Sequence, residues 1–282
     1  VCGWGLVESC VMDGPEVQIM GIVNVTPDSF SDGGEFLDPD RAVEHGRELA
    51  AEGAAILDIG GESTRPGAAE VGVEEELRRV LPVIEGLTGE GVLLSIDTSK
   101  AAVAAAAIDA GATIVNDVTA LADPEMAPLC ADRGCRLVLM HMQGTPRTMQ
   151  EDPSYGDVVD DVRAFLAERM RVAVDAGVDE RRIWLDPGIG FGKTVAHNLE
   201  LIRRLGELSE LGRPVVLGAS RKSFLGKITG REVDQRLGGS IACDVLGMLA
   251  GAEVLRVHDV APTRDAVLVA TAVFGGRPWR AG

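Results

Sequence analysis

Two features common in proteins that bind membranes or nucleic acids are absent from this 282-residue sequence. No uninterrupted apolar stretch reaches the roughly 18 to 20 residues that a membrane span requires. Basic residues are not in excess either, because 27 Lys and Arg against 44 Asp and Glu give a formal net charge of −17. Binding to a phosphate backbone requires a basic face. We therefore expect small molecules as partners, with no nucleic acid and no membrane.

Paired cysteines are also missing. The five cysteines are odd in number and include no C-x-x-C pair, so the sequence indicates neither a disulfide framework nor a zinc knuckle. The first 16 residues contain acidic residues and no basic segment followed by an apolar one, unlike a secretory signal peptide. The simplest location is the reducing cytoplasm.

Lysine is scarce, and its placement is uneven. Each of the four lysines follows a predicted strand end within a few residues: Lys100, Lys193, Lys222 and Lys227. In an acidic protein this placement concentrates positive potential where an anionic substrate could bind. Lys100 and Lys227, taken singly, could equally be solvated loop residues.

The sequence does contain eight short apolar runs that each stop at or beside a polar residue. Such runs, with helical spacing between them, predict strands that alternate with helices. A (β/α)8 barrel, or TIM barrel, has this order, typically spans about 250 residues and places its active site at the carboxyl ends of the strands. We therefore predict an α/β protein with one barrel domain over residues 17–282, after an extension over residues 1–16. The runs are residues 17–23, 55–59, 92–96, 113–115, 137–140, 183–185, 215–219 and 254–257.

The intervening segments carry helix signals. A capping aspartate precedes Pro39 and Pro124, which predicts helices that begin at these prolines. Two strand-to-helix connections, residues 25–38 and 61–72, are longer than a barrel needs, and loops of that length are usually functional. Two apolar stripes at helical spacing are predicted to face the barrel. They are Leu77, Val80, Leu81, Ile84 and Leu87 in one helix and Leu199, Ile202, Leu205 and Leu208 in another.

Two further predicted helices, residues 240–251 and 262–274, are apolar on nearly every side. An outer helix of a barrel should instead show a polar face to water. We expect a homodimer that packs through these two helices. Packing against the termini of the same chain is the alternative.

Several strand ends carry motifs that resemble those of one enzyme family. Residues 20–34 read MGIVNVTPDSFSDGG, which is similar to the first-strand signature of the dihydropteroate synthases of folate biosynthesis. The resemblance covers roughly residues 17–275, and further matching segments follow in the family's order. They are GGESTRPG at 60–67, SIDT at 95–98, NDV at 116–118, DPGIGFGK at 186–193, GASRKSF at 218–224 and RVHDV at 256–260.

The resemblance implies a reaction that joins p-aminobenzoate to hydroxymethyl-dihydropterin diphosphate and expels pyrophosphate. A flat pterin presents N–H donors beside ring acceptors, so carboxylates and amides at fixed points are needed to read it. Matching positions imply that Asp97, Asn116, Asp186 and Lys222 hold the pterin, with Phe191 and Arg256 beside it. A strand-end polar residue can instead cap the next helix, which we expect for Thr98 and Asp123.

The leaving pyrophosphate calls for cations and N–H donors, because its negative charge grows as the C–O bond breaks. Arg256 and His258 stand two residues apart on the last predicted strand, so their side chains point to the same side. The resemblance assigns both to the diphosphate, with Asn24 as a ligand of Mg²⁺ on its oxygens. Asn is a weak ligand alone, so the diphosphate must complete the shell. For a lone strand histidine a core role would be favoured, and the neighbouring Arg256 argues against it.

The two long connections supply the p-aminobenzoate site by resemblance. Thr64, Arg65 and Pro66 belong to one connection and Phe30 and Asp32 to the other, while Ser223 stands beside Lys222. Closure of such loops excludes water from a reactive cation in a dissociative, SN1-like step, and Asp32 could stabilise that cation. The same loop motif predicts inhibition by sulfonamides that compete with p-aminobenzoate.

The glycine-rich segment 188–194 superficially resembles two nucleotide-binding motifs. A P-loop requires a glycine where Pro187 stands, and a dinucleotide loop reads G-x-G-x-x-G rather than G-x-G-x-G. We predict a tight glycine turn that brings Phe191 to the substrate.

Two other functions remain open from the sequence. A methyltetrahydrofolate:corrinoid methyltransferase uses a related pterin-holding barrel, but it would leave Asn24, Arg256 and His258 without a role. A pterin-binding protein without catalysis is the second alternative.

Overall fold

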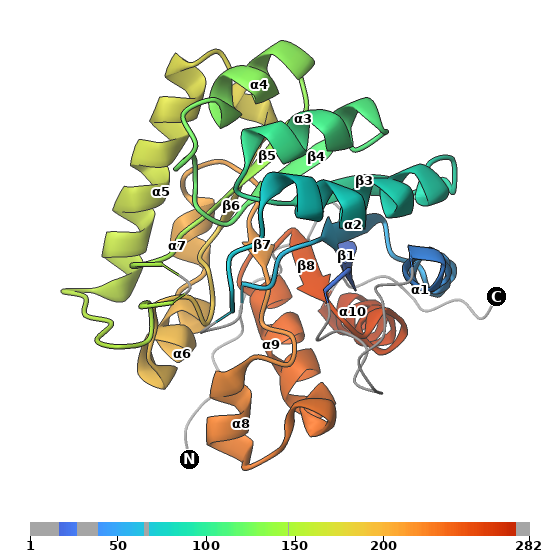
Figure 1. The fold of residues 1–282 in the computed structure, drawn as a ribbon. Coiled ribbons are helices and arrows are strands. Elements are labelled where there is room, and N and C mark those ends of the chain that lie inside the picture. Colours follow the sequence, from blue (N-terminus) through green and yellow to red (C-terminus); the bar gives the residue numbers. More distant parts are fainter. Residues whose placement is uncertain (1–16, 27–38, 65–67, 146, 275–282) are drawn as a thin grey trace, which may run out of the picture.

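The computed structural model describes residues 17–26, 39–64, 68–145 and 147–274. Eight parallel strands stand side by side in the order β6-β5-β4-β3-β2-β1-β8-β7, and a bridge between Leu185 and Val215 joins β6 to the far edge. The predicted TIM barrel is therefore confirmed (Figure 1). The strands are β1 Gln18–Asn24, β2 Ile56–Gly60, β3 Leu93–Asp97, β4 Ile114–Asp117, β5 Arg136–Met140, β6 Ile183–Asp186, β7 Val216–Leu217 and β8 Val254–Val257.

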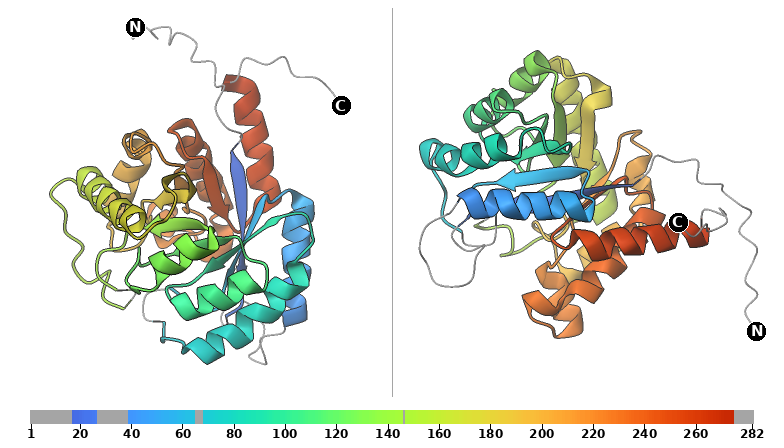
Figure 2. Two further views of the ribbon diagram at one scale, coloured as in Figure 1. Left: turned by 90° about the horizontal axis from the view of Figure 1, so that it is seen from above. Right: turned by 90° about the vertical axis from the view of Figure 1, so that its right-hand side faces the viewer.

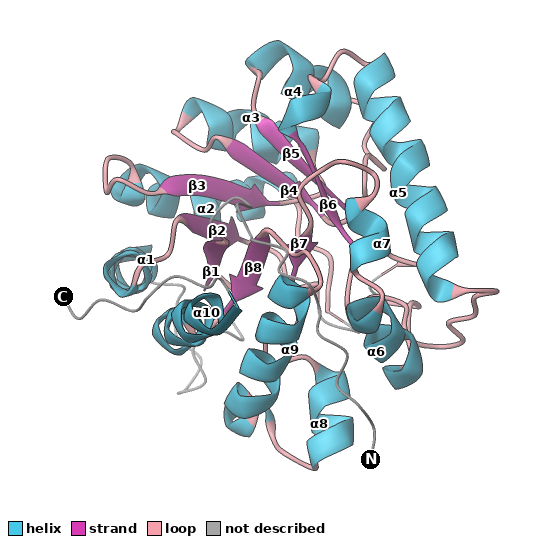
Figure 3. Cartoon of the chain, turned by 180° about the vertical axis from the view of Figure 1, so that it is seen from behind, coloured by secondary structure: helices cyan, strands magenta, loops and turns pink. Residues whose placement is uncertain are grey.

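Helices surround the strands on the outside, which the view from behind shows clearly (Figure 3). All of them except the last, α10, lie in connections between successive strands, so all strands run in the same direction, as in other barrels of this kind. The helices are α1 Pro39–Glu52, α2 Val73–Leu87, α3 Ala101–Asp109, α4 Met126–Arg133, α5 Val158–Asp175, α6 Val195–Arg203, α7 Gly206–Ser209, α8 Ser223–Thr229, α9 Leu237–Leu249 and α10 Val260–Phe274.

Alternation along the strands divides the core into two parts, because successive side chains point to opposite faces of a sheet. One set faces the helices and belongs to the larger apolar cluster, with Leu57, Ile96 and Leu139 among its fully buried members. The other set closes the bottom of the barrel, and each strand contributes one residue. These are Met20, Ile56, Leu93, Ile114, Val138, Trp184, Val216 and Val254.

The stripe predicted for α2 is confirmed in its main positions, since Val80, Ile84 and Leu87 are fully buried. The second stripe is wrong at Leu199, which is 46% exposed, while Leu201 is buried. The single helix that the stripe assumed ends at Arg203, and a separate short helix follows.

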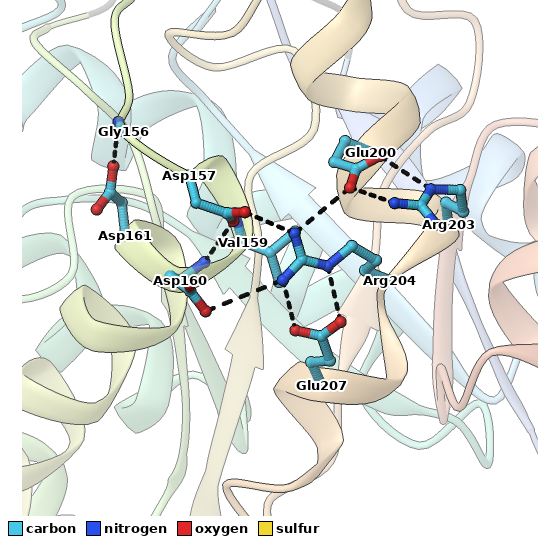
Figure 4. A network of polar contacts seen from close by, with 9 residues as sticks. All are labelled: Gly156, Asp157, Val159, Asp160, Asp161, Glu200, Arg203, Arg204 and Glu207. Carbon is cyan, nitrogen blue, oxygen red and sulfur yellow. Dashed lines mark hydrogen bonds and ion pairs between the residues drawn. The ribbon is translucent and has the colours of Figure 1, made fainter.

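Arg204 marks that break. Its guanidinium binds Glu207 and Asp157, both at 2.7 Å, and Asp157 also caps the first turn of α5 (Figure 4). Because of this break, the leucines of the predicted stripe do not lie on one continuous helix, and the inward positions differ from those predicted.

Of the two helix starts predicted at prolines, one is confirmed and the other is wrong. Helix α1 begins at Pro39, as predicted, whereas α4 begins at Met126 rather than at Pro124. Asp123 accepts hydrogen bonds from the backbone N–H groups of Glu125 and Ala101, at 3.0 and 2.9 Å. Its carboxylate is thus shared between the start of α3 and its own turn, which delays α4 by two residues.

Helices α9 and α10 lie next to each other at one side of the barrel (Figure 2). As expected from their sequences, they keep large apolar side chains on the surface. Within the described residues, none of the helices is both long and apolar enough to cross a membrane. The exposed set is Leu246, Leu249, Leu268, Val269, Val273 and Phe274.

Candidate active site

Polar side chains replace the apolar ones one step above the bottom of the barrel. Asp58, Ser95, Asn116, Asp186 and Arg256 occupy the next inward positions of five strands, two residues beyond the bottom layer. Asp58 and Ser95 are fully buried, and Asn116 and Asp186 nearly so. Unpaired buried charges are costly, so this layer depends on its internal contacts.

Arg256 is the centre of that layer. Its Nε donates to Asp58 Oδ2 and its Nη2 to Asp97 Oδ2, both at 2.6 Å. Asn116 donates from Nδ2 to the same Asp58 oxygen at 3.0 Å. Burial alone lowers the pKa of Arg256, but the charges of Asp58 and Asp97 raise it above its ordinary value. Burial raises the pKa of Asp97, and Arg256 opposes that shift.

Asp186 and Lys222 form the opposite wall. Asp186 accepts a hydrogen bond from the Gly188 N–H at 2.7 Å. Lys222 donates to the carbonyl oxygen of Ile189, and its Nζ lies 4.5 Å from the centre of the Phe191 ring. Burial lowers the pKa of Lys222 to about 8, although the negative charge of Asp186 opposes the shift.

Four side chains donate hydrogen bonds to four successive carbonyl groups of the glycine turn, those of residues 189–192. Lys222 donates to Ile189, Gln150 to Gly190 at 2.7 Å, Lys193 to Phe191 at 2.9 Å and Tyr155 to Gly192 at 2.7 Å. Gly188 has φ +66°, and a Cβ there would lie 1.9 Å from the backbone oxygen of His141, so only glycine fits. The turn therefore fixes Phe191 in the wall, as the sequence predicted.

These walls line a pocket at the carboxyl ends of the strands. It combines an apolar surface with a few converging polar groups, which is typical of small-molecule sites. Seven of the ten residues that line it were predicted from the sequence. The lining is Thr64, Asp97, Asn116, Val118, Met140, Asp186, Phe191, Gly218, Lys222 and Arg256.

Three other predicted residues lie near the rim rather than in that lining. Asn24 ends β1, one inward position above Ile22, and is half-buried. His258 follows β8, and its Nδ1 lies 3.0 Å from the hydroxyl of Ser220. Ser223 is the first residue of α8 and is exposed. The predicted residues Phe30, Asp32, Arg65 and Pro66 lie outside the described residues, so their roles stay predictions.

A metal centre built by the protein alone is not found among the described residues. They contain no group of three or more His, Cys, Asp or Glu side chains placed to hold an ion. Asn24 offers one neutral oxygen, and Asp97 is engaged by Arg256. The donor set fits Mg²⁺ only where a bound polyanion supplies most of the ligands.

Sequence reasoning missed Asp58, although it contacts two residues that were predicted. Asp58 stands inside an apolar run two residues before Gly60, so strand periodicity places it inward with Ile56. A charged residue at an inward position of a buried strand was the available signal. Ser95, which stands directly opposite Asp58 on β3, was also missed, because it too lies inside an apolar run rather than at its end.

Comparisons with known proteins agree with this site. Residues 20–258 match the family described as pterin binding enzyme. Dihydropteroate synthase of Escherichia coli (strain K12) is 45% identical over 260 residues, which cover 92% of each chain. A Yersinia pestis dihydropteroate synthase in complex with a sulfonamide drug has a TM-score of 0.88 at 46% identity, covering 92% of this chain and 94% of that one. The Xanthomonas albilineans enzyme with 4-aminobenzoic acid has a TM-score of 0.87 at 53% identity, with 92% and 93% covered.

Replacing Arg256 with leucine should lower the free energy of unfolding by about 3 kcal/mol, because it leaves the carboxylates of Asp58 and Asp97 buried without a cation. Burial already raises the pKa of Asp97, and loss of the opposing charge of Arg256 raises that pKa further in the folded state, so the loss should shrink as the pH falls below it. Urea denaturation between pH 5 and pH 8 measures both effects, and pairing Arg256→Leu with Asp58→Asn should recover part of the loss.

Arg171→Leu on α5 is the matched control, because its partners Glu168 and Asp175 are exposed. It should change the stability little at either pH. Equal losses for the two leucine variants would contradict a special role for the buried ion pairs.

Proposed function

The chain belongs to the pterin-binding enzymes, among the dihydropteroate synthases, and we propose that it forms 7,8-dihydropteroate by a Mg²⁺-assisted dissociative substitution. Its substrates are p-aminobenzoate and 6-hydroxymethyl-7,8-dihydropterin diphosphate. The observation that carries the proposal is the convergence of Asp97, Asn116 and Asp186 with the cations Lys222 and Arg256 around one cavity.

The buried layer is suited to hold the pterin ring. The bond from Asn116 Nδ2 to Asp58 fixes the orientation of the amide, so the Asn116 carbonyl oxygen can accept from a ring N–H group. Asp186 keeps one carboxylate oxygen beyond the one that binds Gly188. Lys222 would exchange its bond to Ile189 for the carbonyl oxygen and N5 of the ring. Phe191 lies beside Lys222 and offers a flat apolar surface to the bicyclic system.

The diphosphate would extend from this layer toward the rim. Arg256, already oriented by two carboxylates, and His258 would donate to its oxygens, and Asn24 would add one oxygen ligand to Mg²⁺ carried by the diphosphate. When bound, the ion would neutralise the charge that develops on the leaving group. Ser220 accepts from the backbone N–H of His258 at 3.2 Å and contacts its ring, which holds the imidazole in place.

The bond changes then follow from these positions. The C–O bond to the diphosphate breaks, its electron pair leaves with pyrophosphate, and the methylene carbon becomes electron-deficient. The amine nitrogen of p-aminobenzoate forms the new C–N bond and loses a proton. Thr64, Arg65, Pro66 and Ser223 would hold the benzoate, while Phe30 and Asp32 would shield and stabilise the cation.

Pyrophosphate release should require p-aminobenzoate and Mg²⁺ together, because neither the nucleophile nor charge neutralisation is supplied by the protein alone. A coupled pyrophosphate assay on the purified chain, with each component omitted in turn, tests this. Sulfonamides should raise the KM for p-aminobenzoate without lowering the maximal rate. Pyrophosphate release that continues without p-aminobenzoate would contradict the proposed function.

The rate should also depend on the protonation of Lys222, because only its ammonium form carries a positive charge and three N–H donors. Since its pKa is lowered to about 8, kcat/KM for the diphosphate substrate should fall as the pH rises through that value. Lys222→Arg should move this fall to higher pH, and Lys222→Ala should cost about 100-fold in turnover. Lys227→Arg, an exposed lysine of α8, serves as the control. An alkaline limb that stays near pH 8 in Lys222→Arg would refute the assignment.

A homodimer is proposed as the assembled form. Leu246 on α9 and Val269 and Phe274 on α10 are each more than half exposed, and the two helices are adjacent. Large exposed apolar patches mark interaction sites, and a stable interface needs about 800 Å² from each partner. Sedimentation should give a dimer for the wild-type protein and a monomer for Leu246→Glu with Val269→Glu. Leu199→Glu, on α6, should stay dimeric, and a wild-type monomer at micromolar concentration would exclude the dimer.

The cytoplasm remains the proposed location. Cys130, Cys135 and Cys243 are buried free thiols, which suits a reducing compartment.

A further inference from the structure

Lys100 joins two connections of the barrel through a partly buried ion cluster. It stands at the N-cap of α3, three residues beyond Asp97. Its Nζ lies 2.6 Å from Glu76 Oε2 in the first turns of α2, and it also pairs with Glu62, the second residue after β2. The sequence left Lys100 as a possible solvated residue, and the structure corrects that reading, since the side chains of Lys100 and Glu62 are only 17% and 21% exposed.

Glu62 also ties together the two ends of the connection that it begins. Its Oε1 accepts the backbone N–H of Val71 at 3.0 Å, nine residues further along the chain. The preceding residue, Gly61, accepts a hydrogen bond from Arg79 of α2 at 2.8 Å. A Cβ at Gly61 would lie 2.8 Å from the Val80 side chain, so the backbone there rests directly on α2.

The two carboxylates in the cluster have different tasks. Glu76 is fully buried, and removing its cation would leave an uncompensated buried charge. Glu62 is the only contact by which the ammonium reaches the connection, as far as the described contacts go. Burial lowers the pKa of Lys100, but hydrogen bonds to Glu62 and Glu76 raise it above its ordinary value overall.

The cluster stands between two residues that line the pocket. Thr64 lines the pocket and stands two residues beyond Glu62. Asp97 lines the same pocket and stands three residues before Lys100. The ion pair between Lys100 and Glu62 therefore links the connection after β3, the strand that carries Asp97, to the segment that carries Thr64.

We propose that Lys100 is a positioning residue for p-aminobenzoate, which through Glu62 holds Thr64 at the wall of the cavity. This assignment rests on the proposed function. It separates two roles within one cluster: the bond to Glu62 positions the second substrate, and the bond to Glu76 stabilises the fold.

Four variants of the full chain test the separation by steady-state kinetics, with each substrate varied in turn at saturating Mg²⁺, and by thermal unfolding. Glu62→Gln should raise the KM for p-aminobenzoate and the Ki of a sulfonamide by the same factor of about 10, the effect of one charged hydrogen bond. Its kcat, its KM for the diphosphate substrate and its Tm should stay near the wild-type values. Glu76→Gln should lower the Tm and leave the KM for p-aminobenzoate unchanged. Lys100→Met should show both changes, and Lys100→Arg should restore part of the affinity.

Lys227→Met is the control for loss of a lysine charge and should match the wild type in every measurement. An unchanged KM for p-aminobenzoate in Glu62→Gln would overturn the inference. So would an equal rise in KM for both substrates, or a rise in Glu76→Gln as large as in Glu62→Gln. Wild-type protein assayed in parallel keeps the two claims apart, because its p-aminobenzoate-dependent pyrophosphate release upholds the function whatever the variants show.

Discussion

The site depends on one largely buried cation, Arg256, held between two carboxylates inside the barrel. Asp58 and Asp97 each bind a different nitrogen of its guanidinium at 2.6 Å, and Asp58 also fixes the amide of Asn116. Because these four side chains orient one another, none can turn without leaving a polar partner unpaired. The cost of burying these charges is offset within the layer, so the layer can be rigid before a ligand arrives. Rigidity of this kind favours discrimination among flat heterocycles by hydrogen-bond pattern.

The glycine turn after β6 completes that rigid part from the other side. Four side chains occupy four successive carbonyl groups, and Lys193, which is 3% exposed, also contacts Nδ1 of His141 at 2.8 Å. Burial, together with the charge of Lys193, lowers the pKa of His141 to about 3, so its ring stays neutral and can accept that bond. A neutral histidine beside a buried lysine avoids placing two cations in the interior. The turn thereby holds Phe191 and the acceptor of Lys222 in fixed positions.

Strand ends could be read from the sequence because an apolar run that stops at a polar residue signals where a buried strand meets the barrel mouth. Asp97, Asn116 and Asp186 were found in this way, and the structure brings them together around one cavity. Asp58 was not found, since it interrupts a strand rather than ending it. The resemblance to a known family supplied the roles of residues such as Asn24 and His258, which periodicity alone would have left open.

Contacts between connections were beyond the reach of sequence patterns. Lys100 stands 38 residues from Glu62 and 24 from Glu76, and no local spacing relates residues on different connections. The end of α6 at Arg203 was missed for a similar reason, because Arg204 pairs with Asp157, which lies 47 residues away, where periodicity assumed one continuous helix. Local patterns thus predict the elements and their inward positions, while the partners of charged side chains become known only from the packed structure.

The molecule therefore separates its two recognition tasks by the kind of structure that carries them. Groups proposed for the heterocycle stand on strands and a braced turn, where a substitution disturbs buried charge and hence the whole barrel. Thr64, proposed for the second substrate, stands on a connection whose attachment is a few ion pairs and hydrogen bonds. Changes there can alter recognition of p-aminobenzoate and of its competitors while the strands keep their charge balance. Selection by an inhibitor that resembles the second substrate would accordingly act on the connections first, because that is where recognition can change at little cost to stability.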